Sequence, residues 1–357
     1  MSSVFCAEWL QNKSQKTCNT SRNTYGVPLN PISLLRTLKR KIALRLSVDG
    51  GKNVVTIDYR YGLGNQMFQL LTAMSYALRT DSKLVLHDDM ELFARNSQKP
   101  GYHARPLYFD TVFSALKDCC APNFSQYKWD GTHHERFGKY DDLMPLSKFR
   151  HVRLYGYYLS YKYFMPNFNE LIKQLGIDRG IADTKKKYSQ LLNANHVKIS
   201  IHFRMGDFKN TSNVHCILSP DYYTKSLLHI VSQLDANDRK PIDVIFFCEQ
   251  EDDDLVNTQY IAAIRESLAS SKELNNHTSI ENLRFIKAPN NATDWEQMYL
   301  MSCCNHHIIA NSTFSWWGAF LNPHPNKLVV YPAQWLTEHR TADIFPDLVP
   351  PDWEAME

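Results

Sequence analysis

The sequence predicts an α/β fold in which two domains, each built on a mostly parallel sheet, face one another across a cleft. Short apolar segments with strand-like alternation are followed by longer segments with the period of amphipathic helices, and this order favours parallel sheets. The pattern recurs in two blocks, and 357 residues suffice for two domains of ~100–150 residues each. We therefore place a first domain at residues 48–192 and a second at 193–357. Residues 1–47 form a polar and then basic segment, either a disordered or weakly helical tail or a stem that joins an anchor to the domains.

The first block opens with a strand at Val54–Ile57 and a glycine-containing turn. A helix follows, because apolar residues stand 4, 7 and 11 positions after Met67 and form one face with it. Leu84–Leu86 reads as the next short strand. Residues 90–150 are rich in turns and aromatic side chains and show no clear period.

The second block starts with alternation from Val197 to Phe203, which predicts a strand. Ser219 and Pro220 have the residue types of a helix N-cap and first helical position, and an apolar stripe follows them. The remaining predicted elements are strands at 244–247, 283–286, 307–310 and 328–331, and helices from 294 to 304 and from 314 onward.

Composition excludes some classes of protein. A formal net charge of +3 is too small to indicate a nucleic-acid partner, and 43% hydrophobic residues allow a sizeable core. The eight cysteines include no CxxC pair, so a zinc ribbon or thioredoxin-type site is not indicated, and their even number permits disulfides without specifying any. Cys248 and Cys304 stand in apolar segments and are expected to be buried thiols.

The chain contains no apolar segment of the ~18–20 residues needed to span a bilayer, and its first residues do not resemble a signal peptide. We expect membrane attachment only through an anchor absent from this sequence. Seven N-x-S/T sequons are weak evidence for a location in the lumen of the secretory pathway. Among them, Asn311 lies in a predicted strand–helix turn and is not expected to be glycosylated.

Three motifs are candidates for ligand binding. The first, Gly62–Met67, lies between a strand and a helix, where glycines admit a close ligand and the helix N-terminus attracts an anion. Met67 stands where a dinucleotide fingerprint needs a third glycine, so a nicotinamide cofactor is disfavoured. No Lys-Ser/Thr pair forms an NTPase phosphate loop, and a tight turn without a ligand is the alternative.

The second motif, His202–Asp207, ends the strand that begins at Val197. Alternation places the imidazole of His202 and the guanidinium of Arg204 on one face at the carboxyl end of the strand, where α/β sheets bind ligands. Arginine binds phosphate oxygens in a bidentate manner, and Asp207 could hold Arg204 or cap the next segment. The alternative is a surface ion pair.

The third motif, Asn311–Gly318, follows another predicted strand. Its small polar residues supply N-cap hydroxyls and backbone N–H groups to an anion. Trp316 and Trp317 could wall a sugar or base pocket, although core packing is the commoner role of tandem tryptophans.

These motifs, together with Leu154–Tyr158, resemble glycosyltransferase family 11, which contains the galactoside α-1,2-fucosyltransferases. Residues 62–69, 154–158, 202–207 and 311–318 occur in the order seen in that family, and the resemblance covers about residues 53–335. It implies a GT-B-like fold of two Rossmann-like domains, inverting transfer of L-fucose from GDP-fucose to a glycan hydroxyl such as O2 of a galactose, no metal or other cofactor, and residence in the Golgi lumen.

The resemblance also implies residue roles. Arg204 would bind the donor diphosphate, with His202 near the nucleotide, and these two are the candidate catalytic residues. The positions implied to bind the donor are Gly64, Asn65, His202, Arg204, Asp207, Ser312, Thr313 and Phe314. The general base is left open among His202, Asp207, Asp294, Glu296 and a phosphate oxygen of the donor.

The sequence departs from the family pattern in three places. Met205 replaces a second arginine, Cys248-Glu249-Gln250 replaces a Ser-Asp-Asp turn, and Gln297 replaces an aspartate. They motivate an alternative hypothesis, a pseudoenzyme that binds glycan or nucleotide without catalysis. Another transferase that uses a different nucleotide sugar is the third hypothesis.

Overall fold

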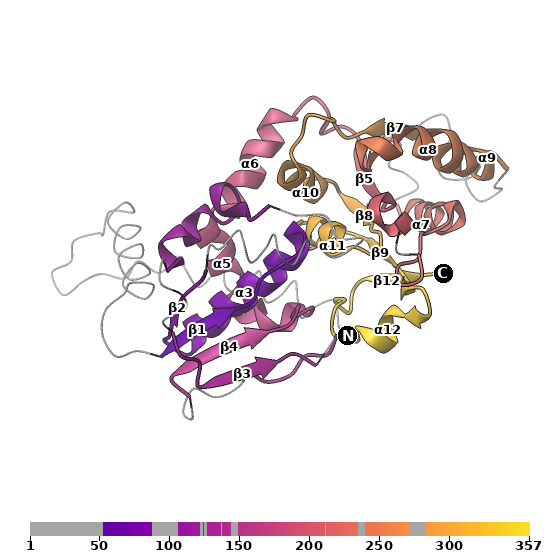
Figure 1. The fold of residues 1–357 in the computed structure, drawn as a ribbon. Helices are drawn as coiled ribbons and strands as arrows, with labels where there is room; N and C mark the ends of the chain where they lie inside the picture. The colour runs from indigo at the N-terminus through magenta and orange to yellow at the C-terminus, as the bar shows by residue number, and fades with distance from the viewer. Residues whose placement is uncertain are drawn as a thin grey trace, which may run out of the picture.

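A computed structural model describes residues 53–87, 106–121, 124, 127–136, 138–143, 149–210, 212–234, 240–270 and 283–357. The predicted tail at 1–47 and much of the 90–150 region lie outside these residues, as do four of the seven sequon asparagines. The described chain contains two parallel sheets with helices against them, which confirms the α/β prediction (Figure 1).

The first sheet has four parallel strands in the order β2-β1-β4-β3. Its strands are β1 (Val54–Ile57), β2 (Lys83–Leu84), β3 (Gly131–His134) and β4 (His151–Tyr155), and the helices of this part are α3 (Leu63–Arg79), α5 (Phe168–Leu175) and α6 (Ile177–Lys187). Short 3-10 turns are η1 (Tyr108–Asp110), η2 (Ser114–Cys119), η4 (Tyr161–Tyr163) and η5 (Met165–Asn167). All four strands lie within the range predicted for the first domain.

The second sheet has six parallel strands in the order β12-β9-β8-β5-β6-β7. They are β5 (Val197–His202), β6 (Ile242–Phe247), β7 (Leu283–Lys287), β8 (His306–Ile308), β9 (Val329–Pro332) and β12 (Glu354–Met356). A small hairpin joins β10 (Gln334–Leu336) to β11 (His339–Arg340). The helical elements are η6 (Gly206–Asn210), α7 (Pro220–Ser232), η7 (Gln250–Asp252), α8 (Asp253–Leu255), η8 (Val256–Ile261), α9 (Ala262–Ser270), α10 (Asp294–Ser302), α11 (Thr313–Phe320) and α12 (Thr341–Ile344).

Helix capping is visible in the sequence and explains where the helices of the second domain begin. Ser219 Oγ accepts a hydrogen bond from the Tyr222 N–H with Pro220 at the first helical position, as predicted. Thr293 and Glu296 form a reciprocal capping box at the start of α10. Ser312 caps α11 by accepting from the Phe314 N–H.

Strand β5 is more buried than its alternating sequence suggests, because it lies between β6 and β8 with both faces covered. Its first two polar residues, Lys198 and Ser200, are buried with partners. The Lys198 amine donates to two backbone carbonyls, and Ser200 hydrogen-bonds to His307 Nδ1 at 2.8 Å. The polar half of the alternation therefore marks buried polar groups rather than an exposed face.

Some elements are shorter than predicted. The strand expected at Leu84–Leu86 is formed only over Lys83–Leu84, with a single bridge from Leu86 to Cys120.

Cys304 is buried as expected, whereas Cys248 is only half-buried. All six cysteines that the structure describes are free thiols.

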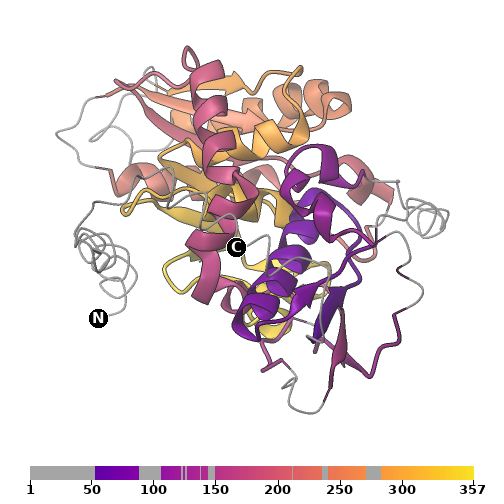
Figure 2. The ribbon, with the colours of Figure 1, turned by 90° about the vertical axis from the view of Figure 1, so that its left-hand side faces the viewer.

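The two sheets share a hydrophobic core. Helix α3 of the first domain packs directly on α11 of the second, and one cluster of buried residues extends from Val55 through α3 to Trp316 and Trp317. The C-terminal segment returns to the first domain and adds Phe345 and Trp353 to this cluster. In Figures 1 and 2 the yellow C-terminal segment accordingly reaches the indigo and magenta elements.

Both tryptophans of the third motif are fully buried in this shared core, so they pack rather than wall a pocket. Each indole N–H finds a backbone carbonyl: Trp316 Nε1 donates to Leu348 O at 3.1 Å, and Trp317 Nε1 donates to Gly64 O at 2.9 Å. Trp317 thereby ties the second domain to the first motif.

Candidate functional site

The second sheet has a topological switch point between β5 and β8. From β5 the chain moves outward to β6 and β7, then crosses back to β8 and continues to β9. Helices α7 and α9 cover one face of the sheet, whereas α10 and α11 cover the other (Figure 1). Ligands of open α/β sheets bind outside the carboxyl ends of the strands at such a point. The second and third motifs follow β5 and β8, so the topology brings them together here.

His202, the last residue of β5, is buried and lies against Phe314 of α11, with ring centroids 5.5 Å apart. Its Nδ1 atom has no hydrogen-bond partner among the described residues. Burial, reinforced by the nearby Arg204, lowers the pKa of His202 to about 3, so the imidazole is neutral at physiological pH. A buried polar atom without a partner is costly, and here it marks a place for a ligand group.

The Arg204 guanidinium lies two residues beyond β5 and forms an ion pair with Glu249, with Nη1 and Oε1 2.5 Å apart. It also stacks over the Phe208 ring at 5.0 Å. Gly206 permits this arrangement, since its φ of +27° is unfavourable for other residues and a Cβ atom there would lie 2.6 Å from the Glu249 carboxylate. The sequence pattern predicted Arg204 but gave no role to Glu249.

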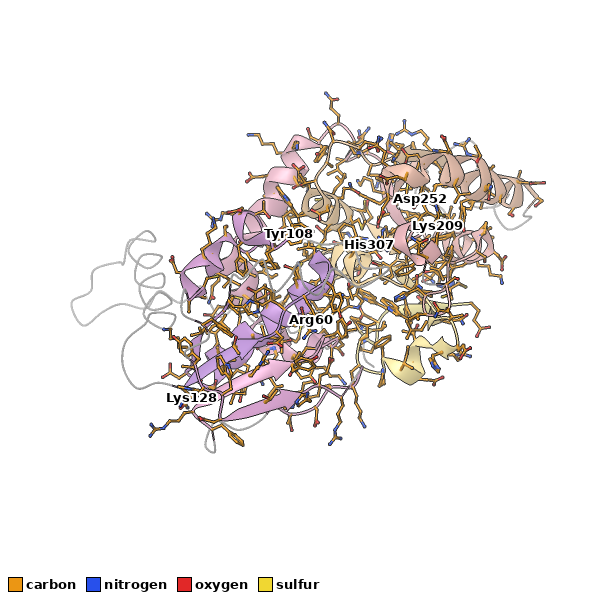
Figure 3. The ribbon with its side chains drawn as sticks, in the orientation of Figure 1. Arg60, Tyr108, Lys128, Lys209, Asp252 and His307 are labelled. Carbon is orange, nitrogen blue, oxygen red and sulfur yellow. The ribbon has the colours of Figure 1, made fainter. Side chains whose placement is uncertain are left out.

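Further charges at this edge are also paired. Buried Asp252 accepts from the Gly206 N–H at 2.9 Å and forms an ion pair with Lys209, and Figure 3 shows these two side chains together. Asp253 pairs with Lys287 and accepts from the Cys248 thiol at 3.3 Å. Burial raises the pKa of Cys248 to about 11, so this thiol stays protonated.

The N-termini of α3 and α11 meet at this site. Thr313 Oγ1 donates to Asn65 Oδ1 at 2.9 Å, and a Cβ atom on Gly64 would lie 2.5 Å from the Thr313 carbonyl carbon. Neither helix has an acidic residue in its first turn, and the α3 N-cap, Gly62, supplies no side-chain cap. The positive ends of two helix dipoles therefore converge, which favours an anion.

The predicted residues Gly64, Asn65, His202, Arg204, Ser312, Thr313 and Phe314 thus gather around the α3–α11 contact and the end of β5. Asp207 lies in η6, but its side chain is outside the described part of the structure. Asn311 is buried, and its amide donates to Cys216 O and Trp335 O at 2.9 Å each, so it is closed to glycosylation in the folded chain.

The three departures from the family pattern have distinct surroundings. Met205 is buried in the hydrophobic core of the second domain. Glu249, which follows Cys248, supplies the Arg204 partner described above. Gln297 donates to Ala292 O at 3.1 Å and supports the loop before α10.

Two candidates for the general base are engaged elsewhere. Glu296 forms the α10 capping box and an ion pair with Lys187 at 2.5 Å; burial alone would raise its pKa, but these partners lower it. Asp294 accepts a hydrogen bond from the Tyr108 hydroxyl of the first domain. Sequence reasoning missed Tyr108, which comes from the region without a clear period.

The described ranges contain no group of three or more His, Cys, Asp or Glu side chains arranged to hold a metal ion. Across the same ranges, no helix has the length and apolar character needed to cross a membrane.

Two Rossmann-like sheets, with a polar anion-attracting site at the switch point of the second, define a GT-B-like α/β protein with a candidate nucleotide site. The sequence profile described as glycosyl transferase family 11 matches residues 41–356. The chain therefore belongs to glycosyl transferase family 11, as its motifs indicated.

Two curated proteins of Escherichia coli are similar to this chain. An alpha-1,2-colitosyltransferase is 24% identical over 317 residues, which cover 85% of this chain and 99% of that protein. The O-antigen biosynthesis glycosyltransferase WbnK is 27% identical over 165 residues, which cover 45% of this chain and 46% of that protein.

Among solved structures, two fucosyltransferases are similar to this chain at low sequence identity. A mutant of Arabidopsis thaliana FUT1 in complex with GDP shares 16% identity with a TM-score of 0.44, covering 88% of this chain and 80% of that one. The fucosyltransferase NodZ from Bradyrhizobium shares 14% identity with a TM-score of 0.41, covering 77% of this chain and 94% of that one.

Proposed function

We propose that this family 11 glycosyltransferase transfers L-fucose from GDP-fucose to a glycan hydroxyl, O2 of a galactose, with inversion at the anomeric carbon. The observation that carries the proposal is the convergence, at one switch point, of two helix N-termini with Arg204 and the unpartnered Nδ1 of His202. This set of groups suits a nucleoside diphosphate, because it combines positive potential with directed hydrogen bonds.

In the proposed reaction the acceptor hydroxyl attacks C1 of fucose while the bond between C1 and the diphosphate oxygen breaks. Negative charge develops on the departing diphosphate, and the acceptor proton passes to a base. Arg204 and the α3 and α11 N-termini would stabilise the leaving group, so no metal ion is required. One such preorganised contact is typically worth ~10²–10³ in rate.

His202 fits the role of a hydrogen-bonding group better than that of a base. An imidazole whose pKa is lowered to about 3 is a weak proton acceptor near neutral pH. We propose that its Nδ1 atom binds the donor. Since Asp294 is engaged by the Tyr108 hydroxyl, Asp207 and a phosphate oxygen of the donor are the remaining candidates for the proton acceptor. A Golgi lumenal setting stays a prediction.

The donor sugar is open to a direct test, since a relative is named for transfer of colitose, the 3-deoxy analogue of fucose. We expect GDP and GDP-fucose to bind the native chain in calorimetry, with GDP-fucose bound more tightly than GDP-colitose. If GDP-colitose binds as tightly as GDP-fucose or more tightly, the proposed donor would be GDP-colitose instead. Binding of GDP without GDP release on any acceptor of a glycan array would favour a pseudoenzyme.

Arg204 provides the sharpest variant. We expect Arg204→Ala to weaken GDP binding at least tenfold, because the diphosphate loses its guanidinium partner. Lys209→Ala, which removes another paired cation from the same edge, is the matched control and should bind GDP within threefold of native. Native-like affinity in Arg204→Ala would refute the assigned donor site.

A further inference from the structure

Two of the four motifs contain residues that the donor site does not use. Gly62–Gln69 follows β1 and Leu154–Tyr158 spans the end of β4, and β1 and β4 are neighbours in the first sheet. From β1 the chain moves to β2 on one side, whereas β4 is reached from β3 on the other. The first sheet therefore has its own switch point, and the two motifs meet outside its carboxyl edge.

Buried Gln69 of α3 connects the loops that follow these two strands. Its Oε1 accepts from the Arg60 N–H, and its Nε2 donates to Gly156 O, both at 2.9 Å. The side chain is 1% exposed, so both bonds form in a water-poor environment and hold the loops in a fixed relation.

Two further polar groups brace the same loops. Buried Gln66 donates to Tyr61 O at 2.7 Å. The Glu135 carboxylate accepts from the Tyr157 N–H at 2.6 Å and the Leu159 N–H at 2.9 Å. The braced backbone includes left-handed tyrosines, with φ of 71° at Tyr61 and 54° at Tyr158. Such strain persists only where the surroundings over-determine it, and it clusters at ligand sites.

The braced loops present three tyrosines, Tyr61, Tyr155 and Tyr157, which we call the tyrosine platform. Tyr61 and Tyr157 stack with centroids 5.2 Å apart and ring planes 18° apart. Tyr155 is 41% exposed, and the Arg60 guanidinium lies over its ring at 4.9 Å. Figure 3 shows Arg60 in the middle of the molecule, on the side of the first domain that faces the second.

Hydrogen-bonding groups border the platform. Asp58 forms a two-point pair with Arg153, at 2.8 and 2.7 Å, and lies 3.5 Å from Arg60. Flat aromatic faces with polar groups at their rim suit a pyranose ring, whose C–H face stacks while its hydroxyls hydrogen-bond. Tyr61 is also three residues from Gly64, where α3 contacts the donor side through Thr313.

We propose that the tyrosine platform, with Arg60 and Asp58 at its rim, binds a neutral pyranose of the glycan acceptor. Gln66 and Gln69 are positioning residues that hold the two loops in place. This inference rests on the proposed function, because it places the acceptor beside the donor site.

The test uses the full chain with saturating GDP on an array of neutral oligosaccharides that end in β-galactose, including lactose and N-acetyllactosamine. We expect Tyr61→Ala and Tyr157→Ala to raise the Kd of the bound glycan at least tenfold, and Tyr157→Phe to restore it to within threefold. Tyr127→Ala is the matched control, because Tyr127 stacks on Trp129 before β3, at the amino end of the same sheet.

Native-like glycan binding by Tyr157→Ala, or an equal loss in Tyr127→Ala, would overturn the platform. So would a failure of the native chain to bind any neutral glycan of the array. A parallel GDP titration separates the two proposals. Glycan binding that depends on the tyrosines without GDP binding would refute the donor proposal alone, whereas unchanged GDP binding in Tyr157→Ala with lost glycan binding supports both.

Discussion

Single residues at the two switch points show how much polar chemistry this fold buries. Gln69 is an example, since one amide satisfies an N–H on one loop and a carbonyl on another. In a sequence, a glutamine nearly two helical turns into α3 looks like a solvated residue. Gln69 has two partners because β1 and β4 are neighbours in the sheet and the loops that follow them lie close together.

We expect Gln69→Leu to lower the free energy of unfolding by ~1–3 kcal/mol, because it leaves two backbone groups without partners. Urea unfolding followed by circular dichroism measures the change. Gln259→Leu, at an exposed glutamine of η8, should change stability by less than ~0.5 kcal/mol. Equal stability of Gln69→Leu and the native chain would mean that the loops do not depend on this brace.

At the residue scale, sequence reasoning identified the side chains that carry charge or lie in motifs. His202 and Arg204 were visible because strand alternation places them together. Glu249 and Tyr108 were not, because their partners are distant in the chain and belong to other elements. Met205 shows the reverse: a departure at a motif position turned out to be a core residue.

At the scale of elements, the contact between α3 and α11 depends on glycine. A Cβ atom on Gly64 would lie 2.5 Å from Thr313 backbone, which cannot yield without moving α11. We expect Gly64→Ala to lower the free energy of unfolding by ~1–3 kcal/mol, as overpacking does, and to weaken GDP binding. Thermal unfolding and calorimetry on the same sample measure both effects.

Gly62→Ala is the control for that variant. A Cβ atom there meets nothing within 4 Å, and its φ of −68° suits any residue. It should fold with native stability. If both variants behave alike, close packing at Gly64 is not what joins the two helices.

Elements with strong local signals were predictable: β1, β5, α3, α7 and α10 lie where apolar period and capping residues indicated. The first domain between β2 and β4 was not. Its short 3-10 turns show no clear apolar period, and the strand β3, Gly131–His134, has no apolar run and takes its place in the sheet by pairing with β4.

At the scale of the whole molecule, three buried histidines link stability to pH. Burial lowers the pKa of His202 to about 3 and, with His324 nearby, that of His306 to about 4, and it lowers the pKa of His307 well below its usual value. In the unfolded chain these groups protonate near pH 6.5. The unfolded state therefore binds more protons as pH falls below 6.5, and stability is lost.

We expect the free energy of unfolding to fall by on the order of 5 kcal/mol between pH 7 and pH 5, since each of the three groups contributes up to ~1.4 kcal/mol per pH unit below pH 6.5. Urea unfolding at several pH values measures this slope. Constant stability over that interval would show that these imidazoles are not held neutral by the fold.

The packed joint between α3 and α11 also bears on how substrate enters and product leaves. A hinge needs a thin, polar connection, whereas here Trp317, Gly64 and a continuous core hold the halves together. We therefore expect the two halves to move together rather than to open about a hinge. Under the proposed function, nucleotide exchange would proceed through local movement, in which the Arg204 guanidinium exchanges the Glu249 carboxylate for a phosphate. Exchange of partners at the Arg204–Glu249 ion pair, rather than domain closure, would then limit the turnover rate.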